Sequence, residues 1–213
     1  MQAGLWLCMG GFDSPVGTGF ALTSRQMGFP SSNQRNSPLH LMPPPAARTD
    51  LLALLDRIGI SHHTVEHPAI FTVEEGRDLK AAMPGGHSKN LFLKDKAGAL
   101  YLAVALSDTK VDLVGLGKRL GAKGRLSFGR PELMTATLGV IPGTVTPFTL
   151  INETARALSR VIIDDAILAH NPIWFHPLEN TASTAVSPPD FMKFLAAVGV
   201  DPLIVDLARP NAA

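Results

Sequence analysis

The stretch at residues 86–95, which reads GHSKNLFLKD, constrains the fold more than any other part of the chain. Its central residues have the length and the apolar and aromatic content of a buried strand. A short Lys-Ala-Gly turn separates it from a second apolar run at residues 100–106, which predicts an antiparallel hairpin. One lysine conflicts with this pattern, because an extended chain places Lys89 on the same face as Leu91 and Leu93.

That lysine has two interpretations. Burying an unpaired ammonium costs free energy, so a lysine among leucines is rare in a structural core and indicates a functional site. Alternatively, Lys89 lies near the start of the strand, where its long side chain can carry the charge out to water. The local pattern leaves both open. Ser88 does not complete a serine–lysine pair, because consecutive residues of a strand point to opposite faces.

Helices and strands are predicted along residues 49–198 without strict alternation. The first helix starts at Thr49 or Asp50, which can cap it. The fold class is therefore α+β, with a mixed, largely antiparallel sheet that is covered by helices. Helices are expected at residues 49–58, 72–83, 112–121, 131–138 and 191–198, and further strands at 62–66, 125–128, 148–151, 161–164, 173–176 and 184–187.

The first residues differ from the rest of the 213-residue chain. Residues 1–47 keep no helix or strand period and are rich in Gly, Ser, Asn and Gln, so we expect a disordered or loosely attached extension. One domain is expected at residues 48–207, with a tail at 208–213. Cys8 is the only cysteine, which excludes an internal disulfide and a cysteine-based zinc site. With no secretory signal pattern and no apolar run near the ~18 residues that span a bilayer, we expect a cytoplasmic protein without membrane contact.

Positive charge is concentrated in one part of the chain. Nine Lys and Arg residues lie between Lys89 and Arg130 against three Asp, although the formal net charge of the whole chain is only +1. Such a local excess is typical of a surface that contacts phosphates, and scattered solvated lysines produce the same pattern. The candidate contacts are Lys94, Lys118 and Arg119.

Residues 63–67 match the literal motif H-x-x-E-H, which in some metallopeptidases places two zinc ligands on one helix. Here Thr64 and Val65 are β-branched and Pro68 follows, so an extended segment is favoured. The two histidines then do not converge as neighbours on a helix do. We expect neither a metal nor a cofactor.

Two further segments stand out. Residues 139–147 combine glycines, which permit unusual backbone angles, with prolines, which fix them, and so form a stiff loop able to present backbone N–H and C=O groups. Residues 176–181, reading HPLENT, place a histidine and an asparagine at the exit of a predicted strand. Taken alone, each is also explained as an ordinary connection or turn.

Taken together, the segments GHSKNLFLKD, GVIPGTVTPF at residues 139–148 and HPLENT resemble the YbaK/ProX superfamily of aminoacyl-tRNA editing domains. The resemblance covers about residues 48–207 and is closest to the free-standing branch called PrdX or ProXp-ala. It implies an α+β globule with a pocket over the sheet. It also implies hydrolysis of the ester that joins a wrong amino acid to tRNA, here alanine on proline tRNA. The implied partners are aminoacyl-tRNA and, transiently, prolyl-tRNA synthetase.

The resemblance also assigns residues. By analogy Lys89 is the essential lysine, and Gly143, Thr144 and Pro147 belong to the catalytic G-x-x-x-P loop. Sister branches remove cysteine or other small residues, and a tRNA-binding module without catalysis would lose nothing when Lys89 is changed. The implied substrate-binding residues are His87, Val145, Thr146, His176 and Asn180.

Overall fold

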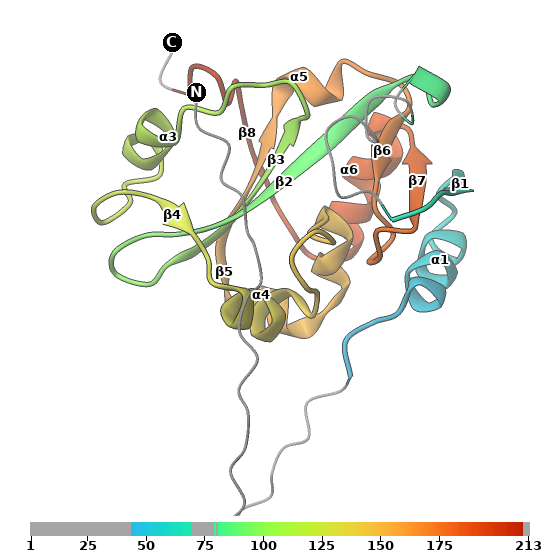
Figure 1. Cartoon of the computed structure of the whole chain (residues 1–213), viewed down its shortest axis with the longest axis horizontal. Helices are drawn as coiled ribbons and strands as arrows, with labels where there is room; N and C mark the ends of the chain where they lie inside the picture. Colours follow the sequence, from blue (N-terminus) through green and yellow to red (C-terminus); the bar gives the residue numbers. More distant parts are fainter. Residues whose placement is uncertain (1–43, 70–78, 80, 211–213) are drawn as a thin grey trace, which may run out of the picture. The chain divides into compact units, whose positions relative to one another are not determined.

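A long strand, β2 (Gly86–Lys94), runs across the middle of the molecule (Figure 1). It pairs along almost its whole length with β3 (Leu100–Leu106), from Ser88 opposite Leu106 to Lys94 opposite Leu100. The predicted antiparallel hairpin is thus confirmed. This computed structural model describes residues 44–69, 79 and 81–210, all within the unit Met42–Ala213.

Around this hairpin the sheet is mixed, in the order β1-β7-β6-β2-β3-β5-β8, with β4 pairing β2 outside that order. Within the described residues, four strand pairs are antiparallel and three are parallel. The predicted α+β class is confirmed. The remaining strands are β1 (His62–Glu66), β4 (Ser127–Phe128), β5 (Leu158–Asp164), β6 (Ile173–Phe175), β7 (Ala182–Val186) and β8 (Leu203–Val205).

Both faces of the sheet are buried, and β3 shows how the sequence achieves this. Leu102 and Val104 point into the main core, whereas Ala103 and Ala105 point into a second core on the opposite face. Each fully buried large aliphatic side chain contributes about 1.5–3 kcal/mol. The main core is covered by α1 (Arg48–Arg57), α4 (Pro131–Leu138) and α6 (Pro188–Ala197), and the second by α3 (Leu113–Arg119). No described helix is long and apolar enough to cross a membrane.

The strand predicted at residues 148–151 is wrong. This segment is a 3-10 helix, η1 (Pro147–Ile151), whose start is fixed by local polar chemistry. The Thr146 hydroxyl accepts from the Phe148 amide at 3.4 Å, and the Thr149 hydroxyl donates to the Thr146 carbonyl at 2.7 Å. Pro147 at the first position also has a backbone angle suited to a helix. These caps outweigh the strand preference of an apolar run.

Helix starts also shift. The first helix begins at Arg48, before the predicted Thr49 or Asp50, and the Asp50 carboxylate instead accepts from the Ala47 amide at 2.8 Å. The last helix begins at Pro188 rather than residue 191, directly after the Ser187 cap.

Sequence periodicity missed three short elements, because three to five residues are too few to show a period. They are η2 (Glu153–Ala157), α5 (Asp165–Leu168) and β8. The strand predicted at residues 125–128 shrinks to the two residues of β4. The helix predicted at residues 72–83 lies largely outside the described residues.

A tight contact joins β4 to the main core. The Gly129 amide donates to the Phe92 carbonyl at 2.9 Å, and a Cβ on Gly129 would lie 2.3 Å from Cδ1 of the buried Phe92 ring. Because packed cores resist added atoms, we expect Gly129→Ala to lower the free energy of unfolding by about 1–3 kcal/mol in a denaturant titration.

Gly117→Ala is the matched control for that substitution. Gly117 lies inside α3, where a Cβ meets its nearest atom, on Leu126, at 3.5 Å. Alanine favours helices over glycine, so this variant should keep or raise the free energy of unfolding. Equal stability of the two variants would contradict the proposed clash.

Candidate active site

The middle of β2 has one edge that no described strand covers. On this edge β6 pairs with only the first two residues of β2, and β4 with only the last two. Residues 88–92 are left between them, and the Phe92 carbonyl accepts from the Gly129 amide directly after β4, so residues 88–91 stay open. The Ser107 amide donates to the His87 carbonyl at 2.7 Å on the β3 side. Because antiparallel ladder groups alternate between the two edges, the N–H and C=O groups of Ser88 and Asn90 face the open edge.

A pocket of about 320 Å³ lies along this edge, and we call it the β2-edge pocket. Its walls come from segments that are far apart in the sequence: β2, β4 with Gly129, α4, the loop that follows α4, and the residue after β6. The lining residues outside β2 are Phe128, Gly129, Met134, Pro142, Gly143, Val145 and His176. The three segments singled out in the sequence therefore meet at one pocket.

Four of the predicted residues line the β2-edge pocket, namely Lys89, Gly143, Val145 and His176. The other residues predicted for the active site do not line it. Thr144, Thr146 and Pro147 are buried within the loop, His87 stacks on Trp174 with ring centroids 6.3 Å apart, and Asn180 lies partly buried in the turn after β6.

Lys89 is partly buried and points its ammonium at backbone oxygens. Nζ donates to the carbonyl of Ser107 at 2.9 Å and to that of Thr109, both in the loop after β3. That loop is held by the fully buried Asp164, which accepts from the Thr109 hydroxyl at 2.6 Å and from the Leu106 amide at 3.2 Å. The ammonium is thus positioned by the protein.

Asn90, which the sequence analysis did not select, joins β2 to the loop on the other face. Its Nδ2 donates to the Val145 carbonyl at 3.0 Å, an acceptor that fixes the orientation of the amide. Its Oδ1 is buried and accepts no hydrogen bond from the described residues. A buried acceptor without a donor costs about 1–3 kcal/mol. The sequence does contain a signal for Asn90, because this polar residue shares a strand face with the apolar Phe92.

The loop at residues 139–147, for which glycine and proline predict stiffness, also has hydrogen bonds of its own. Gly139 ends α4 with φ 72°, and Gly143 has φ 90°, both in the left-handed region that favours glycine. Across Gly143, the Thr144 hydroxyl and amide donate to the Ile141 carbonyl at 2.8 Å and 3.1 Å. Residues 141–144 of the pocket wall are therefore preformed.

His176 presents a neutral imidazole to the pocket. Its Nδ1 lies 3.0 Å from the Ala182 carbonyl, which can only accept, so Nδ1 carries the proton and Nε2 keeps a lone pair. Burial lowers the pKa of His176 below its ordinary value. The hydrogen bond to Ala182 opposes this shift, and nearby His67, with ring centroids 6.0 Å apart, adds to it.

The turn that follows His176 is tied to the first helix. Arg48 pairs with Glu179 in this turn at 2.9 Å and with Glu66 of β1 at 2.5 Å. Leu178 takes a left-handed conformation with φ 70°. The position of His176 therefore depends partly on α1.

Residues 63–66 of the H-x-x-E-H motif are extended on β1, as predicted, and His67 follows directly after the strand. His63 packs against Trp174, whereas His67 lies 3.0 Å from the Ser183 hydroxyl, so the two rings have different neighbours.

Among the described residues, carboxylate oxygens of Asp164, Asp165 and Asp206 lie within 4.8 Å of one another. Those of Asp164 already accept backbone and hydroxyl protons.

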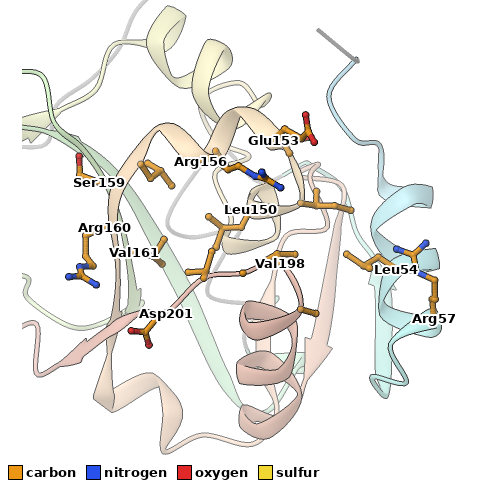
Figure 2. Close-up of a pocket in the computed structure, with 17 residues that line it drawn as sticks. Leu54, Arg57, Leu150, Glu153, Arg156, Ser159, Arg160, Val161, Val198 and Asp201 are labelled. Carbon is orange, nitrogen blue, oxygen red and sulfur yellow. The ribbon is translucent and has the colours of Figure 1, made fainter.

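A larger hollow of about 810 Å³ lies elsewhere, among α1, η1, η2, β5 and the end of α6. Figure 2 shows the apolar side chains of Leu150, Val161 and Val198 among those that line it, together with Arg156 and Arg160, which are exposed. None of the predicted site residues lines it, and its charged side chains are exposed. The β2-edge pocket is the candidate active site.

Comparison with known families decides what kind of domain carries this pocket. The family model of the aminoacyl-tRNA editing domain matches residues 67–194, more than half of the chain. The chain belongs to this family. The editing domain thus includes every residue that lines the β2-edge pocket.

Curated relatives agree with this assignment. Prolyl-tRNA synthetase associated domain-containing protein 1 of Mus musculus is 38% identical over 163 residues, covering 75% of this chain and 95% of the relative. Prolyl-tRNA editing protein ProX of Acetoanaerobium sticklandii is 32% identical over 155 residues, covering 72% and 93%. A solved structure, named as that of a proposed trans-editing enzyme for prolyl tRNA synthetase, has a TM-score of 0.58 and 23% identity, covering 76% of this chain and 97% of that one. It shows the shared fold.

The predicted RNA contacts of the editing domain lie on two elements. Lys94 ends β2, where it pairs with Ser127, and Lys118 and Arg119 form the last turn of α3. Their role stays a prediction, as do the domain limits at residues 48 and 207.

The pKa of His176 predicts a pH dependence of stability. Unfolded histidine titrates near ~6.5. Because the folded pKa is lower, the unfolded chain binds the proton more readily, and stability is lost as the pH falls below this value and through the folded pKa. Denaturant titrations from pH 8 to pH 5 should show a smaller fall in unfolding free energy for His176→Gln than for the wild type. Parallel profiles would contradict this assignment.

Proposed function

We propose that this editing domain hydrolyses the ester that joins a wrongly attached small amino acid to tRNA, most of all alanine on proline tRNA. The unsatisfied Asn90 Oδ1 beside the pocket carries this proposal. An aminoacyl ester brings an α-ammonium group with three N–H donors, which is the chemistry that this buried acceptor lacks. Movement of Val145, which follows the hydrogen-bonded turn at residues 141–144, would bring the two together.

The open edge of β2 supplies a second part of the mechanism. An aminoacyl ester is already activated, so hydrolysis needs a placed water and stabilisation of the developing oxyanion. In our proposal the backbone N–H groups of Ser88 and Asn90 face that oxyanion, and the positive charge of Lys89 lowers its energy. Lys89 is therefore an electrostatic and positioning group and not a nucleophile.

The proton of the attacking water needs an acceptor. His176 is suited to this role, because its neutral form keeps a lone pair on Nε2. The water oxygen adds to the ester carbon, the bond to the ribose oxygen breaks, and His176 passes the proton to that leaving oxygen. The products are the free amino acid and tRNA with its terminal hydroxyl restored.

Selection by size explains why such a site is useful. Alanine fits any site that accepts proline, and one methylene supplies only ~1–3 kcal/mol of discrimination in a binding pocket. A separate pocket that excludes the proline ring can hydrolyse the ester of the smaller, wrongly attached alanine. Met134, Pro142 and Val145 form the wall opposite β2 and are the proposed barrier to proline.

The names of the curated relatives support proline tRNA as the RNA and a transient association with prolyl-tRNA synthetase. We place this reaction in the cytoplasm. Cysteine and serine are also smaller than proline, so esters of these residues are the alternative substrates of the same pocket.

A deacylation panel tests the proposed function. Purified protein should release alanine from alanyl-tRNA(Pro) and leave prolyl-tRNA(Pro) intact, with cysteinyl- and seryl-tRNA(Pro) in the same panel. Faster hydrolysis of cysteinyl- or seryl-tRNA(Pro) would show that cysteine or serine, and not alanine, is the preferred amino acid. Binding of tRNA with no hydrolysis of any of the four would show a tRNA-binding module without catalysis.

Lys89→Ala should abolish turnover in that assay without changing the thermal unfolding midpoint greatly, because the lysine contributes charge at the reaction centre. Lys96→Ala, in the exposed turn after β2, is the matched control and should retain full activity. Wild-type turnover by Lys89→Ala would remove the lysine from the mechanism.

Asn90→Ala should lower kcat/KM for alanyl-tRNA(Pro) by roughly 5- to 150-fold, the loss expected for one buried hydrogen bond worth about 1–3 kcal/mol. The assay should be repeated with an ester of lactic acid, which has a hydroxyl in place of the α-ammonium group. If Asn90 binds the ammonium, the variant loses less activity on the lactyl ester than on the alanyl ester. Equal losses would contradict this role.

A further inference from the structure

Phe128 is an aromatic side chain left in water at the rim of the β2-edge pocket. Its exposed fraction is 63%, and it is the aromatic member of the four large hydrophobic residues that the described structure leaves exposed, the others being Val114, Ile141 and Ile204. A ring that stays in water contributes little to folding, because its apolar area is not removed from solvent. Phe128 also lines the pocket, so a ligand there contacts the ring.

The backbone beneath this ring is fixed. Phe128 pairs with Leu93 in the ladder between β4 and β2, and the next residue, Gly129, donates its amide to the Phe92 carbonyl at 2.9 Å. Leu126, two residues earlier, is buried in the second core. The chain is therefore anchored on both sides of Phe128 while the ring itself stays uncovered. A flat apolar surface held in this way is ready to bind without ordering a loop.

Positive charge lies at the same edge of the sheet. The exposed Arg130 follows Phe128 by two residues, and Lys94 pairs with Ser127 in the β2/β4 ladder, on the opposite sheet face from Phe128 and Leu93. An aromatic face beside cations is the combination with which proteins bind single-stranded nucleic acid, since bases stack on the ring while phosphates meet the cations.

We propose that Phe128 is the stacking platform for an unpaired base at the 3′ end of the RNA whose aminoacyl ester occupies the β2-edge pocket. This inference rests on the proposed function, because the ester lies on the terminal nucleotide. With the aminoacyl group inside the pocket, the attached ribose lies at the mouth and its base, or the next one, reaches the rim. Stacking requires a π face and tolerates any base, so Phe128 adds affinity for the RNA end without reading its sequence.

Equilibrium binding of uncharged tRNA(Pro), followed by fluorescence anisotropy, tests the platform independently of hydrolysis. Phe128→Ala should weaken binding about 5- to 150-fold, the range that corresponds to loss of one stacked base. Phe128→Trp should bind at least as well as the wild type. Phe128→Leu, which keeps apolar volume but lacks a π face, should bind as weakly as the alanine variant. Val114→Ala removes an equally exposed apolar side chain on α3 and should leave binding unchanged.

Kinetics on alanyl-tRNA(Pro) provide the second readout. Stacking acts equally in the bound substrate and in the transition state, so Phe128→Ala should raise KM and leave kcat unchanged. Unchanged binding and KM in Phe128→Ala, or full rescue by Phe128→Leu, would overturn the platform while leaving the proposed hydrolysis intact. Phe128-dependent RNA binding by a protein that hydrolyses no ester would instead keep the platform and overturn the proposed function.

Discussion

The incomplete pairing of β2 is the constraint on which the rest of the site depends. An exposed strand edge is normally paired or covered, because its N–H and C=O groups otherwise recruit another strand. Here β6 and β4 pair with the ends of β2, Gly129 bonds to Phe92, and residues 88–91 are left uncovered. The loop at residues 139–147 covers that gap from one side through the bond between Asn90 and Val145. The pocket thus forms where the hydrogen bonding of the sheet is unfinished.

Groups at the pocket are positioned by contacts that lie outside it. Asp164 holds Thr109, whose carbonyl in turn accepts from Lys89. On another side, Asn152 donates to the carbonyl of Leu138 at the end of α4 and accepts from the amide that precedes α1. Such buried polar contacts fix donors and acceptors before a ligand arrives, which is the condition for electrostatic stabilisation of a transition state. Substitutions far from the pocket are therefore able to alter it.

Sequence patterns were sufficient for some of this arrangement and insufficient for the rest. The hairpin, the mixed sheet and the stiff loop follow from periodicity and from glycine and proline, which act locally. The open edge depends on where β6 and β4 stop, a long-range property that no local pattern contains, so Asn90 and Phe128 were missed. At residues 148–151 two local signals compete, because Thr146 and Pro147 favour the start of a helix whereas the apolar run that follows favours a strand, and the helix start prevails.

The length of β4 has a consequence for how such a site changes. A strand rises about 3.3 Å per residue, so the uncovered part of β2 is about 13 Å long. This part ends where the pairing of β2 with β6 and with β4 begins, and each pair of residues in these ladders is either formed or absent. Extending β4 toward the middle of β2 would therefore shorten the opening in whole-residue steps, whereas substitutions in the loop at residues 139–147 change its depth gradually. Length and depth of the opening are thus controlled by different parts of the chain, which lets one vary while the other is kept.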